Sequence, residues 1–217
     1  GVGIVTARPK PTKQEFEAIK AAAAPKGPPP MKRMTELIST LDKLQTAEFE
    51  GLRCIIEDIL PEGCTVLGGK PKIGKTWAAQ DMGLAVATPG GKFMGKKCEH
   101  GDVLDLALED NERRFQRRMK RFYGPDKSRW PKRFTFATQW PTLDDGCIEY
   151  IEEWISSVER PLLVIIDILE NVKPINDRRS SKDPQYRIDY NAVAPFRDLA
   201  AKHKIAVLPL HHQRKMA

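Results

Sequence analysis

The chain contains a complete phosphate-binding motif. The spacing G-x-x-x-x-G-K-[ST] is met by Gly69-Lys70-Pro71-Lys72-Ile73-Gly74-Lys75-Thr76. In such a loop backbone N–H groups close around phosphates, the Lys reaches the β- and γ-phosphates, and the Thr hydroxyl holds Mg²⁺. We therefore expect ATP and Mg²⁺ to bind here, with these contacts: Gly69, Lys70, Pro71, Lys72, Ile73, Gly74, Lys75, Thr76 and Trp77. The alternative is a chance match in an ordinary turn.

The segments beside this loop have the character that the motif requires. Cys64–Leu67, before the loop, is short and β-prone, and Trp77–Ala85, after it, has the composition of a helix. The N-terminus of a helix adds favourable positive potential for bound phosphates. This order of strand, loop and helix favours phosphate binding over a chance match.

A second acidic site is needed for Mg²⁺, on a strand that lies beside the loop. Leu162–Ile166 is a continuous apolar run, and Asp167 follows it directly. Such a run is typical of a central strand covered on both faces. We expect Asp167, together with Thr76, to hold the metal, with Asp167 acting through water. The alternative is an Asp that only caps the turn after the strand.

The carboxylate that activates water has to lie elsewhere. Enzymes of the AAA+ and ABC types usually place a catalytic Glu directly after the Mg²⁺-binding Asp, and here that residue is Ile168. This favours the RecA-like branch, which uses the tip of another strand. An apolar segment ends directly before Glu109, which is placed to orient or deprotonate the attacking water. The alternative is that Glu109, Asp110 and Asn111 only form the N-terminal cap of the next helix. Both can also hold, with Asp110 or Asn111 as the cap and Glu109 free for chemistry. Glu170 is a weaker alternative base.

Three segments occur in a characteristic order: Gly68–Trp77, Leu106–Asp110 followed by an Arg-rich helix, and Leu208–His212. Over about residues 55 to 215 the chain resembles the RepA-type hexameric replicative helicases of plasmids and phages, in the RecA/DnaB-like superfamily of P-loop ATPases. In that family a His at the tip of the last strand senses the γ-phosphate and connects it to a DNA-binding loop. The resemblance therefore implies a catalytic sensor role for His212, or else His211. The alternative is that both are polar residues ending a strand.

The same resemblance implies single-stranded DNA as a partner and self-association into a ring, a hexamer in the full-length protein. The sequence departs from the family at Ile168, where Thr or Ser is usual, and it ends at Ala217, before the family's final strands and arginine finger. We therefore expect a core that is truncated at its C-terminus and hydrolyses ATP poorly by itself. The Pro-rich start suggests a tether from an upstream primase or other replication module.

Positive charge gathers in two places. Residues 1–33 carry seven Lys or Arg against two Glu, and residues 113–133 carry ten against one Asp, within a chain of net charge +7. Such clustering suggests an anionic partner such as nucleic acid. A solubilising tail and a solvated helix face explain it equally well. The loop Val172–Arg187, which follows the Asp167 strand, is a second candidate DNA contact.

The order of elements predicts an α/β fold, a RecA-like P-loop NTPase core with a mainly parallel sheet flanked by helices. The expected strands are Thr65–Gly68, Val103–Leu108, Phe134–Ala137, Leu162–Ile168 and Ile205–Leu210. The expected helices of the core are Lys75–Val86, Glu112–Phe122, Ile148–Val158 and Asp189–Lys202. We divide the chain into a Pro/Ala-rich basic linker (1–31), an accessory helix (32–48) with an apolar stripe, and the ATPase core (49–217).

Composition argues against several classes of protein. The 217 residues, 41% of them hydrophobic, can bury one sizeable core, and no apolar run approaches the ~18 residues of a membrane span. The four Cys are scattered without a C-x-x-C pair, which argues against zinc and disulfides and favours a cytoplasmic protein. No signal peptide is visible, and the start at Gly1 indicates a fragment.

These features predict an ATP-binding, Mg²⁺-dependent ATPase motor that acts on single-stranded DNA, a replicative helicase of a mobile genetic element. Lys75, Glu109 and His212 are its expected catalytic residues. Two alternatives stay open. One is an ATP-dependent switch or assembly protein, such as a helicase loader, without unwinding activity, and the other is a recombination or repair ATPase that coats DNA.

Overall fold

The computed structural model describes residues 38–48, 51, 53–124, 126–174 and 185–212. The chain divides into two units, Gly1–Glu50 and Gly51–Ala217, and each is described by itself. The linker predicted over residues 1–31 lies outside the described residues.

Within the described residues 38–48 of the first unit, helix covers less than the accessory helix predicted over residues 32–48. It is α3 (Leu41–Gln45), and residues 38–40 before it are not helical. Thr40 sets the start, because its hydroxyl oxygen accepts a hydrogen bond from the Lys43 N–H at 3.4 Å, as an N-cap does. Leu41 and Leu44 of the predicted apolar stripe are exposed.

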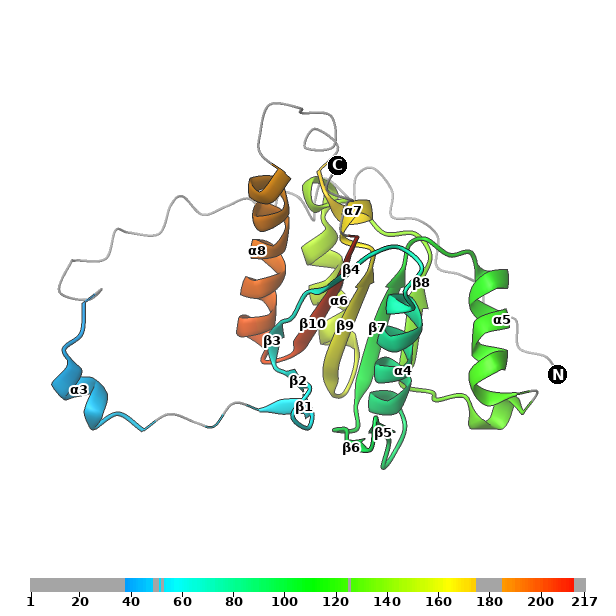
Figure 1. The fold of residues 1–217 in the computed structure, drawn as a ribbon, viewed down its shortest axis with the longest axis horizontal. Helices are drawn as coiled ribbons and strands as arrows, with labels where there is room; N and C mark the ends of the chain where they lie inside the picture. Colours follow the sequence, from blue (N-terminus) through cyan, green and yellow to red (C-terminus); the bar gives the residue numbers. More distant parts are fainter. Residues whose placement is uncertain (1–37, 49–50, 52, 125, 175–184, 213–217) are drawn as a thin grey trace. The chain divides into compact units, whose positions relative to one another are not determined.

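The second unit is built around a six-stranded sheet (Figure 1). Its strands are β3 (Gly63–Cys64), β4 (Leu67–Gly69), β7 (Asp102–Ala107), β8 (Phe134–Ala137), β9 (Pro161–Asp167) and β10 (Ala206–His212). The order across the sheet is β8, β7, β9, β10, followed by β3 and β4, which both pair with β10. Every pairing is parallel, which confirms the predicted α/β fold with a mainly parallel sheet.

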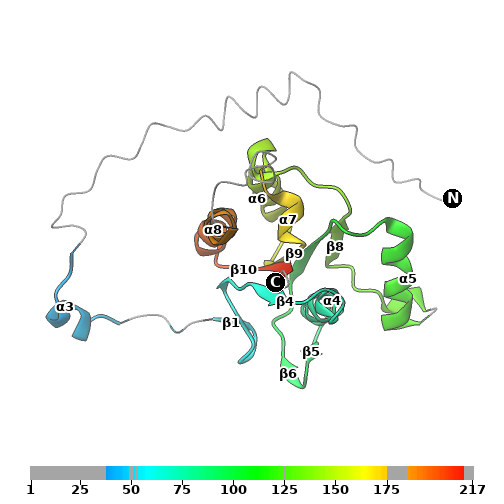
Figure 2. The ribbon, with the colours of Figure 1, turned by 45° about the horizontal axis from the view of Figure 1, so that its top comes forward.

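Helices cover both faces of this sheet (Figure 2). One face carries α4 (Lys75–Ala87), and the other carries α6 (Cys147–Ser157), α7 (Leu169–Val172) and α8 (Gln185–His203). Alternate side chains of β9 feed the two cores: Leu163 and Ile165 are buried in the cluster that contains α4, while Val164 and Ile166 are buried in the cluster of α6 and α8. The continuous apolar run of β9 therefore reflects burial on both faces.

The Arg-rich segment forms α5 (Glu112–Tyr123), which packs through a buried apolar stripe. Phe115 stacks on Phe136 of the edge strand β8, with ring centroids 4.1 Å apart, and Met119 is buried in a cluster with Leu84 of α4. Asn111 is the N-cap, its side-chain oxygen accepting a hydrogen bond from the Arg114 N–H at 2.9 Å. The polar face of α5 is left on the outside.

The strand predicted before the phosphate loop is split into β3 and β4, with Thr65 and Val66 between them. Val207 of β10 accepts a hydrogen bond from the Thr65 N–H at 2.9 Å, so alternate residues of β10 turn their backbone groups towards this strand. The next residue in that alternation is Pro209, which has no N–H to donate. The ladder is interrupted at this point and resumes at Leu67.

Several short elements were not predicted from the sequence. Two antiparallel hairpins pair β1 (Cys54–Ile56) with β2 (Leu60–Pro61) and β5 (Lys92–Phe93) with β6 (Lys96–Lys97). Two 3-10 turns cover Lys127–Arg129 and Leu143–Asp145. Strands of two or three residues are too short to show a period of two. Across the described part of the chain, no helix combines the length and the apolar character needed to cross a membrane.

Candidate nucleotide-binding site

The predicted site residues gather at one edge of the sheet, towards the top of Figure 1. The carboxyl ends of parallel strands meet at the same edge. The phosphate loop follows β4, Glu109 follows β7 by two residues, and Asp167 and His212 end β9 and β10. The strand of Asp167 does not pair with the strand that precedes the loop, because β10 lies between β9 and β4. This order puts His212 between the loop and Asp167.

The loop has the backbone conformation that only glycine adopts easily. Gly74 has φ +97° at the N-cap of α4 and makes no side-chain cap, so the first N–H groups of α4 lie open. At Gly69 a Cβ atom would come within 2.5 Å of Cδ1 of the exposed Ile73 side chain, which would have to move aside. Residues 70–73 are exposed. The loop can therefore bend around an anion at the helix N-terminus.

Lys75 is buried at the first position of α4, with only 7% of its surface exposed. Its ammonium donates to the carbonyl oxygens of Gly69 at 2.9 Å and Lys70 at 3.0 Å, and lies 3.0 Å from His212 Nδ1. These contacts use all three of its N–H donors. Any new bond from Lys75 to a phosphate oxygen must therefore replace one of them.

His212 bridges the loop and the tip of β7. Because an ammonium can only donate, Nδ1 of His212 accepts from Lys75, and its ring proton then sits on Nε2. That nitrogen lies 3.7 Å from Glu109 Oε2. His211, in contrast, lies with Nδ1 2.7 Å from Glu170 Oε1. Of the two predicted sensors, the fold brings His212 to the loop and His211 to α7.

Asp167 lies at the tip of β9, 4% exposed, and the Thr76 hydroxyl hydrogen-bonds to it. Burial raises the pKa of the Asp167 carboxyl, and the hydrogen bond from Thr76 opposes this rise. Its Oδ1 is buried without a hydrogen-bond partner. The peptide bond between Asp167 and Ile168 is cis. The fold thus brings together the two residues predicted to hold Mg²⁺.

These residues fit a magnesium ion. Mg²⁺ takes oxygen ligands and is usually held by one or two carboxylates together with substrate phosphates. A buried carboxylate oxygen without a donor beside a hydroxyl is such a donor set. Among the residues that the structure describes, no group of three or more His, Cys, Asp or Glu is placed to hold a metal by itself. An ion here would need phosphate oxygens and water to complete its coordination.

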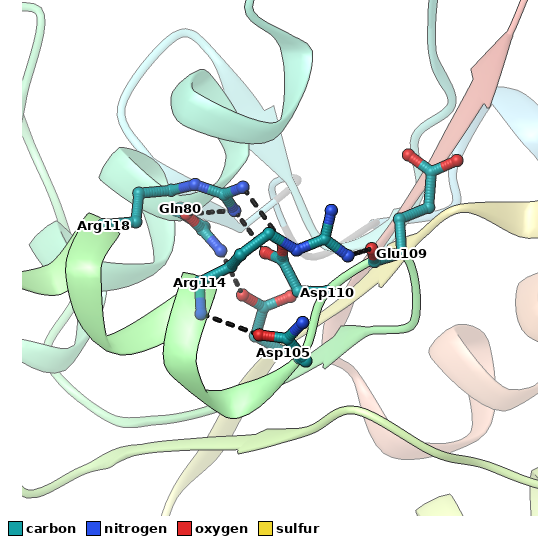
Figure 3. Close-up of polar contacts among 7 residues, drawn as sticks. Gln80, Asp105, Glu109, Asp110, Arg114 and Arg118 are labelled. Atoms are coloured by element: carbon teal, nitrogen blue, oxygen red, sulfur yellow. Dashed lines mark hydrogen bonds and ion pairs between the residues drawn. The ribbon is translucent and has the colours of Figure 1, made fainter.

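Glu109 lies in the turn after β7 with its side chain half exposed, so its carboxylate is accessible to water. The backbone of the turn is held on two sides. The Leu108 N–H donates to the Asp167 carbonyl at 2.8 Å, and the Arg114 guanidinium donates to the Glu109 carbonyl at 2.6 Å (Figure 3). Glu170, the weaker alternative base, lies on α7 beside His211.

The indole of Trp77 lies against α5. Its ring centroid is 5.2 Å from that of Phe122, and the guanidinium carbons of Arg118 and Arg121 lie 5.5 and 5.9 Å from its centroid. These are cation–π distances. Contact between Trp77 and a nucleotide stays a prediction.

Sequence reasoning missed three polar side chains beside the site: Gln80 on α4, Asp105 on β7 and Arg118 on α5. Gln80 Nε2 donates to Asp105 Oδ2 at 3.1 Å, and Arg118 donates to Gln80 Oε1 at 3.1 Å. The available signal was Asp105, a charged residue within an otherwise apolar strand. A buried charge of this kind requires partners, which the sequence alone does not identify.

Comparison with known proteins gives one finding about the family. A family model described as an AAA domain matches residues 28–217. No curated protein matches the chain. The match contains the phosphate loop and the residues that the fold places around it, Glu109, Asp167 and His212.

Proposed function

This chain belongs to the AAA domain family of P-loop ATPases, and we propose that within it the chain is an ATP-driven motor on single-stranded DNA, the replicative helicase of a mobile genetic element. The family and the phosphate loop support ATP binding and hydrolysis. The helicase role, a hexameric ring and an upstream primase rest on the sequence resemblance and form part of the same proposal.

The observation that carries the proposal is the chain of contacts from Lys75 through His212 to Glu109. When Lys75 donates to phosphate oxygens it gives up a present acceptor, and His212 is the one whose side chain can move. Nδ1 of His212 then loses its donor, and the ring is free to turn or to take up a proton. His212 is the last residue of β10, so a movement of its ring when the terminal phosphate binds is transmitted to the segment that follows this strand.

In hydrolysis Glu109 accepts the proton of the attacking water as a general base, while Lys75 neutralises charge on the phosphates. Thr76 and Asp167 would hold Mg²⁺, which when bound neutralises charge that develops on the phosphate oxygens. Leu108 fixes the distance between the Glu109 turn and the tip of β9 through its hydrogen bond to Asp167.

Charge supports a polyanionic partner. The helix α5 presents five exposed basic side chains, Arg113, Arg114, Arg117, Lys120 and Arg121. Phosphate contacts of this type supply the sequence-independent part of nucleic-acid binding. The other candidate, the loop Val172–Arg187, lies almost wholly outside the residues whose side chains are described.

The test is ATP hydrolysis with and without single-stranded DNA, for the wild type beside Lys75→Ala. We expect hydrolysis that DNA stimulates and that the variant abolishes, together with strand separation on a forked duplex. Tight ATP binding with slow hydrolysis that DNA does not change would overturn the motor and favour an ATP-dependent switch. Stimulation by DNA without strand separation would favour a recombination or repair ATPase.

A further inference from the structure

We propose that Arg118 is a positioning residue for hydrolysis, which holds the turn that carries Glu109 against α4, the helix that begins at the phosphate loop. This inference rests on the proposed ATPase function. Glu109 follows β7, whereas Lys75 and Thr76 lie on α4. Their relative placement decides whether water activated by one element can reach a phosphate held by the other. Arg118 comes from a third element, α5, and contacts both (Figure 3).

Towards the Glu109 turn, Arg118 binds Asp110, the residue directly after Glu109. Its Nη1 lies 2.7 Å from Asp110 Oδ2, and its Nη2 donates to Asp110 Oδ1 at 3.3 Å. Both nitrogens of the fork therefore meet both oxygens of the carboxylate, the strongest and most directional arrangement for this pair. The side chains are 18% and 7% exposed, so water screens the pair little.

Towards α4, Arg118 binds Gln80. Its Nη1 donates to Gln80 Oε1, and Gln80 Nε2 donates to Asp105 Oδ2 of β7. A guanidinium can only donate, so the oxygen of the Gln80 amide must face Arg118, and its N–H₂ group then faces Asp105. Gln80 and Asp105 are 1% and 0% exposed. The guanidinium is thus anchored to the buried interface between α4 and the sheet.

A third contact brings Arg118 to the first turn of α4. Its guanidinium carbon lies 5.5 Å from the ring centroid of Trp77, and Trp77 directly follows Thr76. Arg118 therefore spans from the residue after the metal-binding Thr to the residue after Glu109. Arg114 also reaches Asp110, at 3.5 Å, but its side chain is 53% exposed, and exposed pairs of this type contribute little.

The test compares Arg118→Met, which keeps an unbranched apolar side chain and removes the fork, with Arg118→Lys. The matched control is Lys92→Met, which also removes a positive charge, from an exposed residue of β5 for which no side-chain contact is described. Steady-state ATP hydrolysis gives kcat and KM, and binding of a fluorescent ATP analogue gives Kd. Thermal unfolding establishes that each variant is folded, and Arg118→Lys replaces Arg118→Met if the latter is not.

We expect Arg118→Met to lower kcat by about 100-fold, because misplacement of a reacting group by about 1 Å has an effect of this order. KM and the Kd of the analogue should stay within about twofold of wild type, because Arg118 lies on α5, outside the phosphate loop. Arg118→Lys should restore part of kcat, since an ammonium can pair with Asp110 but cannot also hold Gln80 with fork geometry. Equal kcat values for Arg118→Met and Lys92→Met, or a loss confined to KM, would overturn the proposal.

A second measurement separates this inference from the function on which it rests. If the wild type binds ATP but does not hydrolyse it, the proposed function fails, and hydrogen exchange still tests the position of the turn. The N–H groups of Leu108 and Asp110 donate to Asp167 at 2.8 Å and to Ala107 at 3.0 Å. Arg118→Met should speed their exchange by about tenfold or more while Lys92→Met does not. Unchanged exchange would show that Arg118 does not hold the turn.

Discussion

The buried carboxyl of Asp105 makes the free energy of unfolding depend on pH, and the substitution Asp105→Asn should remove this dependence. Asp105 has no exposed surface, and its Oδ1 has no hydrogen-bond partner. Burial raises its pKa to about 7 from an ordinary value of 3.8, and the hydrogen bond from Gln80 only partly opposes this. Asp105→Asn replaces the carboxyl with a group of the same shape that does not titrate. The amide oxygen of Asn can still accept from Gln80.

The sign follows from proton binding. Between the two pKa values the folded state keeps a proton that the unfolded state has released, so the free energy of unfolding falls as pH rises and levels off above the folded pKa. About three pH units separate the values, at about 1.4 kcal/mol each, so the whole effect is about 4 kcal/mol. From pH 5 to pH 8 the wild type should therefore lose about 3 kcal/mol relative to Asp105→Asn.

Urea unfolding followed by tryptophan fluorescence at pH 5, 6, 7 and 8 measures this difference. The control is Asp144→Asn, which removes an exposed carboxylate and should follow the wild type at each pH. The absolute stability of Asp105→Asn at one pH is not the test, because the new amide N–H₂ also lies in a buried place. A difference between Asp105→Asn and wild type that stays constant from pH 5 to pH 8 would refute the reasoning.

Two further predictions concern packing and the sensor. Gly83→Ala should destabilise the protein by about 1–3 kcal/mol, because a Cβ there would lie 2.8 Å from Phe134 Cε2 and 2.9 Å from Ile165 Cδ1. Thermal unfolding measures this, at about 2–4 °C per kcal/mol for a chain of this size, and an unchanged Tm would contradict it. His212→Ala should lower ATP turnover by about tenfold or more, and His211→Ala, which loses a contact with Glu170, should lower it much less. The reverse order in a turnover assay would assign the sensor to His211.

Much of the core could be predicted because the signals are local. The strand Phe134–Ala137 lies where expected, and α4, α5 and α6 lie within one residue of the predicted bounds at each end. Apolar runs and periodicity report directly on burial in elements of this length. Helix ends were predicted less well. The helix α8 begins at Gln185, four residues before its predicted start, and α3 is shorter than predicted. Helix ends depend on caps and packing that periodicity does not report.

The candidate site divides in the same way. The sequence by itself determined that a phosphate loop joins a strand to a helix, and that Glu109 and Asp167 follow apolar strands, since each of these is a pattern of neighbouring residues. Only the tertiary structure decided that His212 rather than His211 faces Lys75, and that Gln80, Asp105 and Arg118 meet beneath the Glu109 turn. Strand order and the direction of a side chain from its strand arise from contacts between segments far apart in the chain, and no local pattern records them.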